Sequence, residues 1–407
     1  MKKNKVSVAA SKSYLQRALA ISALAEGTSV LNEVSWCNDS EAARKIIENL
    51  GSKTSEINRK LSVSSRVLDI NNLNFNAGEA GLSIRMFSPI LALSKKEINF
   101  TGEGSLKTRP NDIIINALSQ LGVEIESNKG FLPLKIKGPI QSGNIEIDGS
   151  LSSQLLTGLL IALPMIDGNS TIEVHNLKSA PYIDMTLSIM QNFGVHVENI
   201  NYKTFKIKGN QKYKATNFDI EGDWSGGAFF LVYGAVKGKI EASNLNPNSL
   251  QADKTILSAL KLAGAKITLK EKSTIVEKGQ LNAFDFDATD CPDLFPPLVC
   301  LASQCNGVSK IKGISRLTHK ESDRAKVLLK EFVKMGFEIS LENDNMFVTG
   351  GNAETCTIDS HNDHRIAMAG GIMNLFCDGE IKIKNKDAIN KSYPNFFKDL
   401  NKIKNQK

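Results

Sequence analysis

The strongest constraint on the fold is a pattern that recurs about every 70 residues along the chain. Five times, an amphipathic helical stretch is followed by a glycine and then by a short alternating strand. These glycines are Gly51, Gly122, Gly194, Gly264 and Gly336. Leucines and isoleucines at helical spacing bury one face of such a helix, and glycine ends it in the left-handed conformation without steric cost. A repeat of about 70 residues is large enough to be a module of several strands and helices.

A second element keeps the same period: a polar stretch that leads directly into an apolar helix. Its six copies lie at residues 11–24, 78–93, 149–163, 222–236, 289–302 and 360–375. A single core rarely grows beyond about 250–300 residues, so six repeats in 407 residues predict two domains of three repeats each. The last repeat ends in a helix with no strands after it. We expect the N-terminal strand VSVAA to fill that gap, which would return the N-terminus to the second domain.

The starts of these helices carry more charge than helix capping requires. Lys12, Arg17, Arg85 and Arg365 all lie at or near a predicted helix start. The first turn of a helix has unpaired N–H groups and a partial positive charge, so a cation there is unfavourable unless an anion is bound. A lone Ser or Asp at such a place is an ordinary N-cap. The basic residues instead predict a cleft rich in anion-binding groups, where the helix starts of two domains face each other.

Composition and missing motifs exclude several classes of protein. No apolar run reaches the ~18–20 residues needed to span a membrane, and MKKNKVSV does not have the form of a signal peptide. The six cysteines form no CxxC pair, which favours reduced thiols in the cytoplasm. The net charge of +7 comes from scattered lysines, which favours a solvated surface over a nucleic-acid interface. Neither a Walker A sequence nor a strand–GxGxxG–helix is present. His361 and His364 have only fair metal-ligand spacing, and the sequence shows no Cys or carboxylate cluster to support a metal site.

Ten short motifs, in order along nearly the whole chain, resemble those of the 5-enolpyruvylshikimate-3-phosphate synthase family. They are SKSYLQRALAISAL, GEAGLSIR, the RP of KTRPND, DGSLSSQ, KSAPYIDMTL, EGDWS, CPDLFP, HKESDR, NDHRIAM and NKSYP. The resemblance implies an α/β (α+β) fold of two domains, each of three repeated βαβαββ units around buried parallel helices. It places residues 11–220 in a shikimate-phosphate-side domain and residues 1–10 with 221–407 in the second domain. The active site is expected in the cleft between them.

The reaction implied by this resemblance transfers the enolpyruvyl (1-carboxyvinyl) group of phosphoenolpyruvate to the 5-hydroxyl of shikimate 3-phosphate. It proceeds by addition and elimination and releases phosphate. No metal or organic cofactor is expected. The expected partners are the two small-molecule substrates, with no nucleic acid and no membrane, and the expected state is a cytoplasmic monomer.

The family's binding residues carry over to matching positions. The expected shikimate 3-phosphate contacts are Lys12, Ser13, Arg17, Ser152, Ser153, Gln154, Ser179, Tyr182, Asp293 and Lys320. The expected phosphoenolpyruvate contacts are Lys12, Gly81, Arg85, Arg109, Gln154, Arg324, Arg365 and Lys391. Arginine suits such sites because its planar fork matches carboxylate and phosphate oxygens.

The expected catalytic residues are Asp293, Glu321, Lys12, Lys391 and His364. Addition needs a base on the 5-hydroxyl and an acid that protonates the methylene carbon of phosphoenolpyruvate. Asp293 resembles the family's base and Glu321 its proton donor, while Lys391 remains a second candidate for that proton.

The chain departs from the family pattern at several positions, and these bear on rival functions. Glu79 stands where the family has Asn, and this added carboxylate near the phosphoenolpyruvate pocket is expected to alter affinity for anionic analogues. Arg316 stands where an Asn is sometimes seen, which leaves that contact open. The related UDP-N-acetylglucosamine enolpyruvyl transferase has a reactive Cys where this chain has Gly104. A non-catalytic repeat protein that binds polyanions would not need Asp293 and Glu321, and an inactive synthase would not keep all the main charged positions.

Overall fold

The computed structural model describes residues 4–66, 68, 70, 72–150, 152–318 and 320–404. The chain divides into two compact units, one of Lys12–Ile220 and one of Met1–Ser11 with Glu221–Lys407. Within the described residues, every helix is too short or too polar to cross a membrane.

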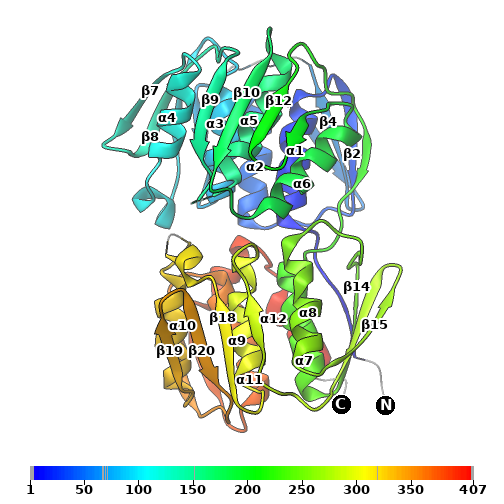
Figure 1. Cartoon of the computed structure of the whole chain (residues 1–407). Helices are drawn as coiled ribbons and strands as arrows, with labels where there is room; N and C mark the ends of the chain where they lie inside the picture. Colours follow the sequence, from blue (N-terminus) through cyan, green and yellow to red (C-terminus); the bar gives the residue numbers. More distant parts are fainter. Residues whose placement is uncertain are drawn as a thin grey trace. The chain divides into compact units, whose positions relative to one another are not determined.

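The unit Lys12–Ile220 contains three four-stranded sheets of the same design (Figure 1). In each sheet an edge strand pairs in parallel with the next strand, and two antiparallel pairings follow. The first sheet has the order β13 (Asn217–Asp219), β2 (Gly27–Asn32), β4 (Lys60–Ser65), β3 (Lys53–Ile57). The second has the order β5 (Asn74–Asn76), β6 (Glu97–Thr101), β8 (Phe131–Lys137), β7 (Glu124–Asn128). The third has the order β9 (Asn144–Asp148), β10 (Ser170–His175), β12 (Thr204–Ile207), β11 (Glu198–Ile200).

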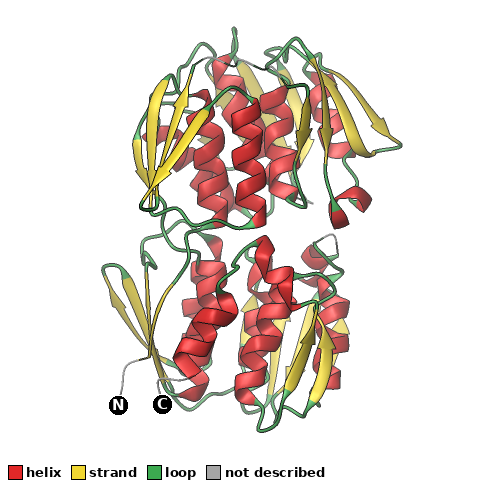
Figure 2. Cartoon of the chain, turned by 180° about the vertical axis from the view of Figure 1, so that it is seen from behind, coloured by secondary structure: helices red, strands yellow, loops and turns green. Residues whose placement is uncertain are grey.

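The helices of this unit are of two kinds. The inner ones are almost wholly buried: α1 (Lys12–Leu24), α3 (Gly81–Leu91) and α5 (Gln154–Ala162). The others bury only one face: α2 (Asn38–Asn49), α4 (Asp112–Gln120) and α6 (Ala180–Asn192). Figure 2 shows the sheets of this unit arranged around its helices. The polar stretch before each inner helix therefore lies at the N-terminal end of that helix.

The second unit repeats this design with one shortened sheet. Its sheets have the orders β1 (Asn4–Ser7), β14 (Lys239–Ser243), β16 (Ser273–Glu277), β15 (Lys266–Lys270); then β17 (Asp285–Asp287), β18 (Val308–Lys312), β20 (Asn345–Thr349), β19 (Ile339–Glu342); and β21 (Cys356–Asp359), β22 (Ile381–Lys384). The inner helices contact one another: α7 (Trp224–Lys237), α9 (Phe295–Ala302) and α11 (His364–Phe376). The other helices are α8 (Ile256–Leu262), α10 (Arg324–Lys334) and α12 (Phe396–Lys404).

One sequence prediction about the strands is wrong. The N-terminal strand does not fill the gap in the last repeat, because β1 pairs in parallel with β14, with Asn4 opposite Ile240. The last repeat keeps a two-stranded sheet, and α12 contacts α11 in that repeat. The N-terminal strand instead forms the parallel edge strand of the sheet that contains β14.

The glycines that ended each predicted helix all adopt positive φ. The values are +102° for Gly51, +73° for Gly122, +84° for Gly194, +97° for Gly264 and +89° for Gly336. These are left-handed conformations that glycine adopts without steric penalty. The repeat read from the sequence and the α/β fold class are therefore confirmed.

Candidate active site

A buried arginine organises the charged residues of the second unit. Arg324 begins α10, and none of its side chain is exposed. Its Nη1 donates to Asp293 Oδ1 at 2.9 Å, its Nη2 to Glu321 Oε2 at 2.6 Å, and its Nε to Asp363 Oδ2 at 2.9 Å. Burial alone would lower the pKa of Arg324, but the three carboxylates raise it above its ordinary value. The guanidinium is thus a permanent charge that holds three carboxylates, two from its own repeat and Asp363 from the next.

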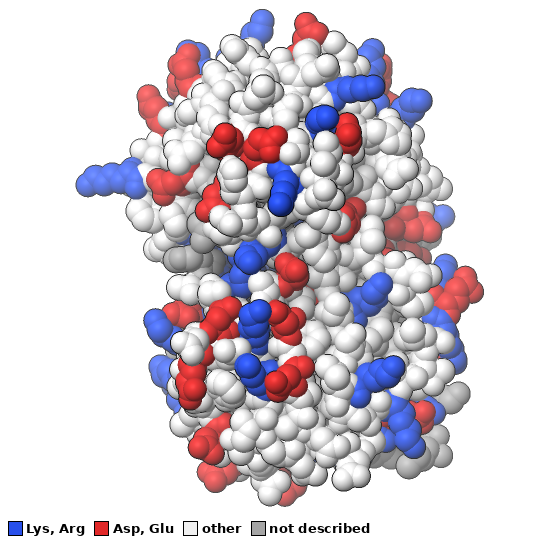
Figure 3. Space-filling model, viewed as in Figure 1, with Lys and Arg blue, Asp and Glu red and all other residues white. Residues whose placement is uncertain are grey.

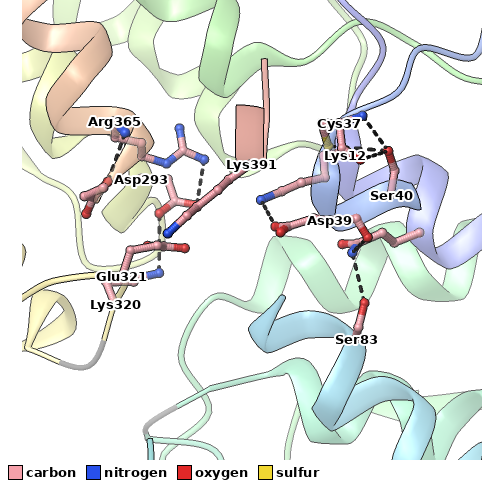
Figure 4. Close-up of polar contacts among 12 residues, drawn as sticks. Lys12, Cys37, Asp39, Ser40, Ser83, Asp293, Lys320, Glu321, Arg365 and Lys391 are labelled. Carbon is pink, nitrogen blue, oxygen red and sulfur yellow. Dashed lines mark hydrogen bonds and ion pairs between the residues drawn. The ribbon is translucent and has the colours of Figure 1, made fainter. Parts of the chain in front are cut away.

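Asp293 lies among three cations. It belongs to the 3₁₀ turn η4 (Pro292–Leu294) that leads into α9. Besides Arg324, its Oδ2 accepts a hydrogen bond from Arg365 Nη2 at 3.0 Å, and its Oδ1 lies 3.4 Å from Lys320 Nζ (Figure 4). About a quarter of the Asp293 side chain is exposed, at 23%. The carboxylate therefore has three cationic partners while part of it remains exposed.

Arg365 has hydrogen-bonding capacity left for a ligand. Burial opposes its charge, yet Asp293 raises its pKa above the ordinary value. Its Nε is buried and has no hydrogen-bond partner within the described residues. Burying an unsatisfied donor on a charged group is costly, so an anion at this position would be stabilising.

Glu321, His364 and Lys391 complete this cluster. His364 is the first residue of α11, is 1% exposed, and has a ring nitrogen within 4.8 Å of carboxylate oxygens of Glu321 and Asp363. Those two carboxylates also accept hydrogen bonds from Arg324, which offsets their charge. Lys391 ends the turn η6 (Lys386–Lys391) and donates from Nζ to the Asn362 carbonyl at 2.7 Å.

In the unit Lys12–Ile220, two arginines and a glutamine meet beside Gly81. Arg85 Nη1 donates to Gln154 Oε1 at 2.9 Å. A Cβ on Gly81 would lie 3.0 Å from Arg109 Nη1 and 3.1 Å from Arg85 Nη1. Burial, with the nearby charge of Arg109, lowers the pKa of Arg85 to about 10.

Arg85 and Arg109 have no carboxylate partner in the part of the chain that the structure describes. No carboxylate within the described residues forms an ion pair with Arg85 or Arg109. Arg109 is 7% exposed, and its buried Nε has no hydrogen-bond partner in the same part of the chain. Two adjacent buried cations that lack a carboxylate partner among the described residues have the chemistry that an anion with two or more oxygens requires.

Lys12 and Arg17, both on α1, each have a defined partner. Lys12 Nζ lies 2.7 Å from Asp39 Oδ2 (Figure 4). Arg17 is 1% exposed and donates from Nε to Thr186 Oγ1 at 2.9 Å and from Nη1 to the Ser13 carbonyl at 3.0 Å. Burial lowers the pKa of Arg17 to about 10. Its guanidinium carbon lies 5.9 Å from the centre of the Tyr182 ring.

The predicted serines lie at helix starts. Ser153 is the N-cap of α5, and Ser152 Oγ accepts from Gln154 N at 3.1 Å. Ser179 is the N-cap of α6, with φ of 61° and 5% exposure.

The structure therefore assembles the predicted residues into two sets, one in each unit. The set of the unit Lys12–Ile220 comprises Lys12, Ser13, Arg17, Gly81, Arg85, Arg109, Ser152, Ser153, Gln154, Ser179 and Tyr182. The set of the second unit comprises Asp293, Lys320, Glu321, Arg324, His364, Arg365 and Lys391. Sequence reasoning missed the groups that hold these side chains: Asp39, Asp363, Thr157 and Thr186. An acidic residue at a helix start beside a basic motif was the available signal for Asp39 and Asp363.

Comparisons with known proteins identify the family of this chain. The family profile described as EPSP synthase (3-phosphoshikimate 1-carboxyvinyltransferase) matches residues 2–400. The chain is 35% identical to the 3-phosphoshikimate 1-carboxyvinyltransferase of Clostridium novyi (strain NT), covering 98% of this chain and 94% of that protein. It is 36% identical to the protein of the same name from Clostridium acetobutylicum, covering 98% and 95%.

Solved structures give the same result. The EPSP synthase from Acinetobacter baumannii superimposes with a TM-score of 0.83 at 25% identity, covering 98% of this chain and 95% of that one. Because the family profile and relatives above 30% identity both cover nearly the full length, the chain belongs to the EPSP synthase (3-phosphoshikimate 1-carboxyvinyltransferase) family.

Proposed function

We propose that the two residue sets described above serve the single reaction of this family. That reaction, which the chain catalyses as a family member, transfers the enolpyruvyl group of phosphoenolpyruvate to shikimate 3-phosphate in aromatic amino acid biosynthesis. The observation that carries the proposal is the contrast between the sets. One presents Arg85 and Arg109, which form no ion pair among the described residues, and the other presents the part-exposed carboxylate of Asp293 among cations.

Arg85 and Arg109 are proposed to bind phosphoenolpyruvate, together with Gln154 and the backbone at Gly81. The substrate carries a carboxylate and a phosphate, and each can accept paired hydrogen bonds from a guanidinium fork. Burial makes these arginines strong ligands, because their charges are not screened by water. Arg365 and Lys391 are proposed to bind the same substrate from the second unit, and Arg324 to hold the carboxylates in place around it.

Shikimate 3-phosphate is proposed to lie against the helix starts that carry serines. Ser152, Ser153 and Ser179 supply hydroxyl donors at the first turns of α5 and α6, where backbone N–H groups also favour an anion. Ser13, Arg17 and Tyr182 are proposed to bind this substrate, with Lys12 and Gln154 touching both. Asp293 and Lys320 would bind its ring hydroxyls from the second unit.

The proposed chemistry uses one carboxylate as a base. Asp293 accepts the proton of the 5-hydroxyl as its oxygen bonds to C2 of phosphoenolpyruvate. Glu321 or Lys391 gives a proton to the methylene carbon, which yields a tetrahedral ketal phosphate. Elimination returns a proton from that carbon and expels phosphate, re-forming the double bond. Such acid–base assistance contributes roughly 10²–10⁴-fold to the rate.

The rest of the surface supports small-molecule partners. On the face seen in Figure 3, basic and acidic side chains are interspersed and form no continuous basic stripe of the kind that binds nucleic acid. We propose that the enzyme works as a monomer in the cytoplasm, without a metal or organic cofactor.

The test is phosphate release by the purified protein from shikimate 3-phosphate and phosphoenolpyruvate. We expect steady release that needs both substrates and is unchanged by a chelator. Asp293→Ala and Arg109→Ala should each remove most of it. Lys137→Met, in an exposed ion pair with Glu124, is the control and should keep full turnover. Unchanged turnover in Asp293→Ala would overturn the assignment of the base.

A further inference from the structure

We propose that Glu79 is a positioning residue for Arg109, acting through the turn η1 (Gly104–Thr108) and not through contact with substrate. This inference rests on the proposed role of Arg109 in phosphoenolpyruvate binding. It gives a structural route by which Glu79, expected near that pocket, would affect binding there.

The Glu79 carboxylate faces the turn. Its Oε2 accepts a hydrogen bond from Ser105 N at 3.3 Å. A Cβ on Gly104 would collide with the same carboxylate, since its nearest atoms include Glu79 Oε1 at 2.8 Å. The first N–H groups of a helical turn have no partner within it, and a carboxylate acceptor is favourable there. Gly104 has a φ of +49°, so glycine both fits the backbone and leaves room for Glu79.

A chain of hydrogen bonds continues from this contact to Arg109. Ser105 Oγ accepts from Arg109 Nη2 at 3.1 Å, while Arg109 Nη1 lies beside Gly81. Arg109 N also donates to the Leu106 carbonyl at 3.3 Å, which closes the turn. A shift of Ser105 would therefore move the guanidinium that faces the proposed anion site.

The two segments are also joined near Glu79. Glu103 N donates to the Gly78 carbonyl at 2.6 Å, and Asn76 Nδ2 donates to Glu103 Oε1 at 2.7 Å. These bonds fix the start of the turn, whereas the bond from Glu79 fixes Ser105 itself. Losing Glu79 should loosen Ser105 and leave the segment folded.

The experiment measures KM for phosphoenolpyruvate, KM for shikimate 3-phosphate and kcat in Glu79→Ala and Glu79→Gln. Glu79→Ala should raise KM for phosphoenolpyruvate about tenfold, the scale of one lost hydrogen bond to a charged group. The other two constants should change by less than about twofold, because the base and the second substrate's contacts are elsewhere. Glu79→Gln keeps an acceptor oxygen and should restore most of the affinity.

Two further measurements separate this role from others. Ser105→Ala breaks the next bond in the chain, so its effect on KM should not add to that of Glu79→Ala in the double variant. Hydrogen exchange at residues 104–109 should be faster in Glu79→Ala than in the wild type, whatever the activity. Arg109→Ala tests the proposed function separately, since a normal KM there would reject Arg109 as a ligand.

A repulsive role for the Glu79 charge predicts the opposite change in KM for phosphoenolpyruvate. A negative charge that repels phosphoenolpyruvate would make both Glu79→Ala and Glu79→Gln bind it more tightly. A lower or unchanged KM in Glu79→Ala, with Arg109→Ala strongly impaired, would overturn the positioning role and leave the binding role of Arg109 intact.

Discussion

Nη1 of Arg324 lies 2.9 Å from Oδ1 of Asp293, and no part of the arginine side chain is exposed. The same guanidinium also binds Glu321 and Asp363. One permanent cation therefore fixes the position of the proposed base, the proposed acid and the N-cap of α11. Arg324 therefore offsets the negative charge of these carboxylates before an anionic substrate binds.

Arg324→Met should destabilise the fold because it leaves three carboxylates without their buried counter-ion. Removing one partner of a buried ion pair costs about 3–5 kcal/mol. We expect a fall of that size in the free energy of unfolding, measured by urea denaturation monitored by circular dichroism. Lys137→Met removes an exposed pair and should cost less than about 1 kcal/mol. Equal losses in the two variants would show that the Arg324 cluster does not stabilise the fold.

Asp293→Asn separates catalysis from stability. The amide oxygen can still accept a hydrogen bond from Arg324 or Arg365, so the variant should fold, but it cannot take a proton from a hydroxyl at neutral pH. We expect kcat to fall at least about 100-fold, within the range of general base catalysis. The measurement is phosphate release under saturating substrates. A loss of only a few-fold would reject Asp293 as the base.

Gly81→Ala should weaken phosphoenolpyruvate binding. The added methyl group would lie 3.0 Å from Arg109 Nη1 and 3.1 Å from Arg85 Nη1, so one or both guanidinium groups must move. We expect KM for phosphoenolpyruvate to rise about tenfold or more, as for a lost charged hydrogen bond. Gly143→Ala is the matched control, since its nearest contact is Leu121 Cδ2 at 3.8 Å. A similar KM in Gly81→Ala and wild type would contradict this geometry.

Asp253, in the turn η3 (Ala252–Thr255), should make stability depend on pH. Burial, and then the charge of Asp293, raise its pKa from 3.8 to about 7. Ser225 Oγ donates to its Oδ2, and within the described residues its Oδ1 has no hydrogen-bond partner. The folded state therefore keeps a proton that the unfolded state has lost, so this contribution to stability is complete below pH 3.8 and disappears as pH rises through 7.

Asp253→Asn has no such proton to lose. Relative to the wild type, its free energy of unfolding should rise with pH between about 4 and 7, by up to about 4 kcal/mol. Urea unfolding at several pH values in this range measures the difference. Asp287→Asn is the control: burial opposes, but hydrogen bonds from Thr289 and Lys312 lower the pKa of Asp287, so its effect falls below the range. A constant difference for Asp253→Asn would contradict the prediction.

The sequence by itself determined the repeat, because its evidence is local. Helical spacing followed by Gly51 or Gly122 specifies a helix end, and both glycines adopt the positive φ that this requires. The family motifs also predicted Asp293, Arg324 and Arg365 as site residues, and the structure brings these three side chains into contact. Local patterns could not give the partner of the N-terminal strand, because β1 pairs with residues more than 200 positions away.

Only the tertiary structure decided how the charges are paired. Lys12 meets Asp39 and Arg324 meets Asp363 across different elements, whereas Arg85 and Arg109 meet no carboxylate in the described part of the chain. Glu79 was expected near the phosphoenolpyruvate pocket, and the tertiary structure adds its hydrogen bond from Ser105 N in the neighbouring turn. A side chain's electrostatic role depends on which groups lie within a few ångströms, and long-range packing, not sequence spacing, sets those distances.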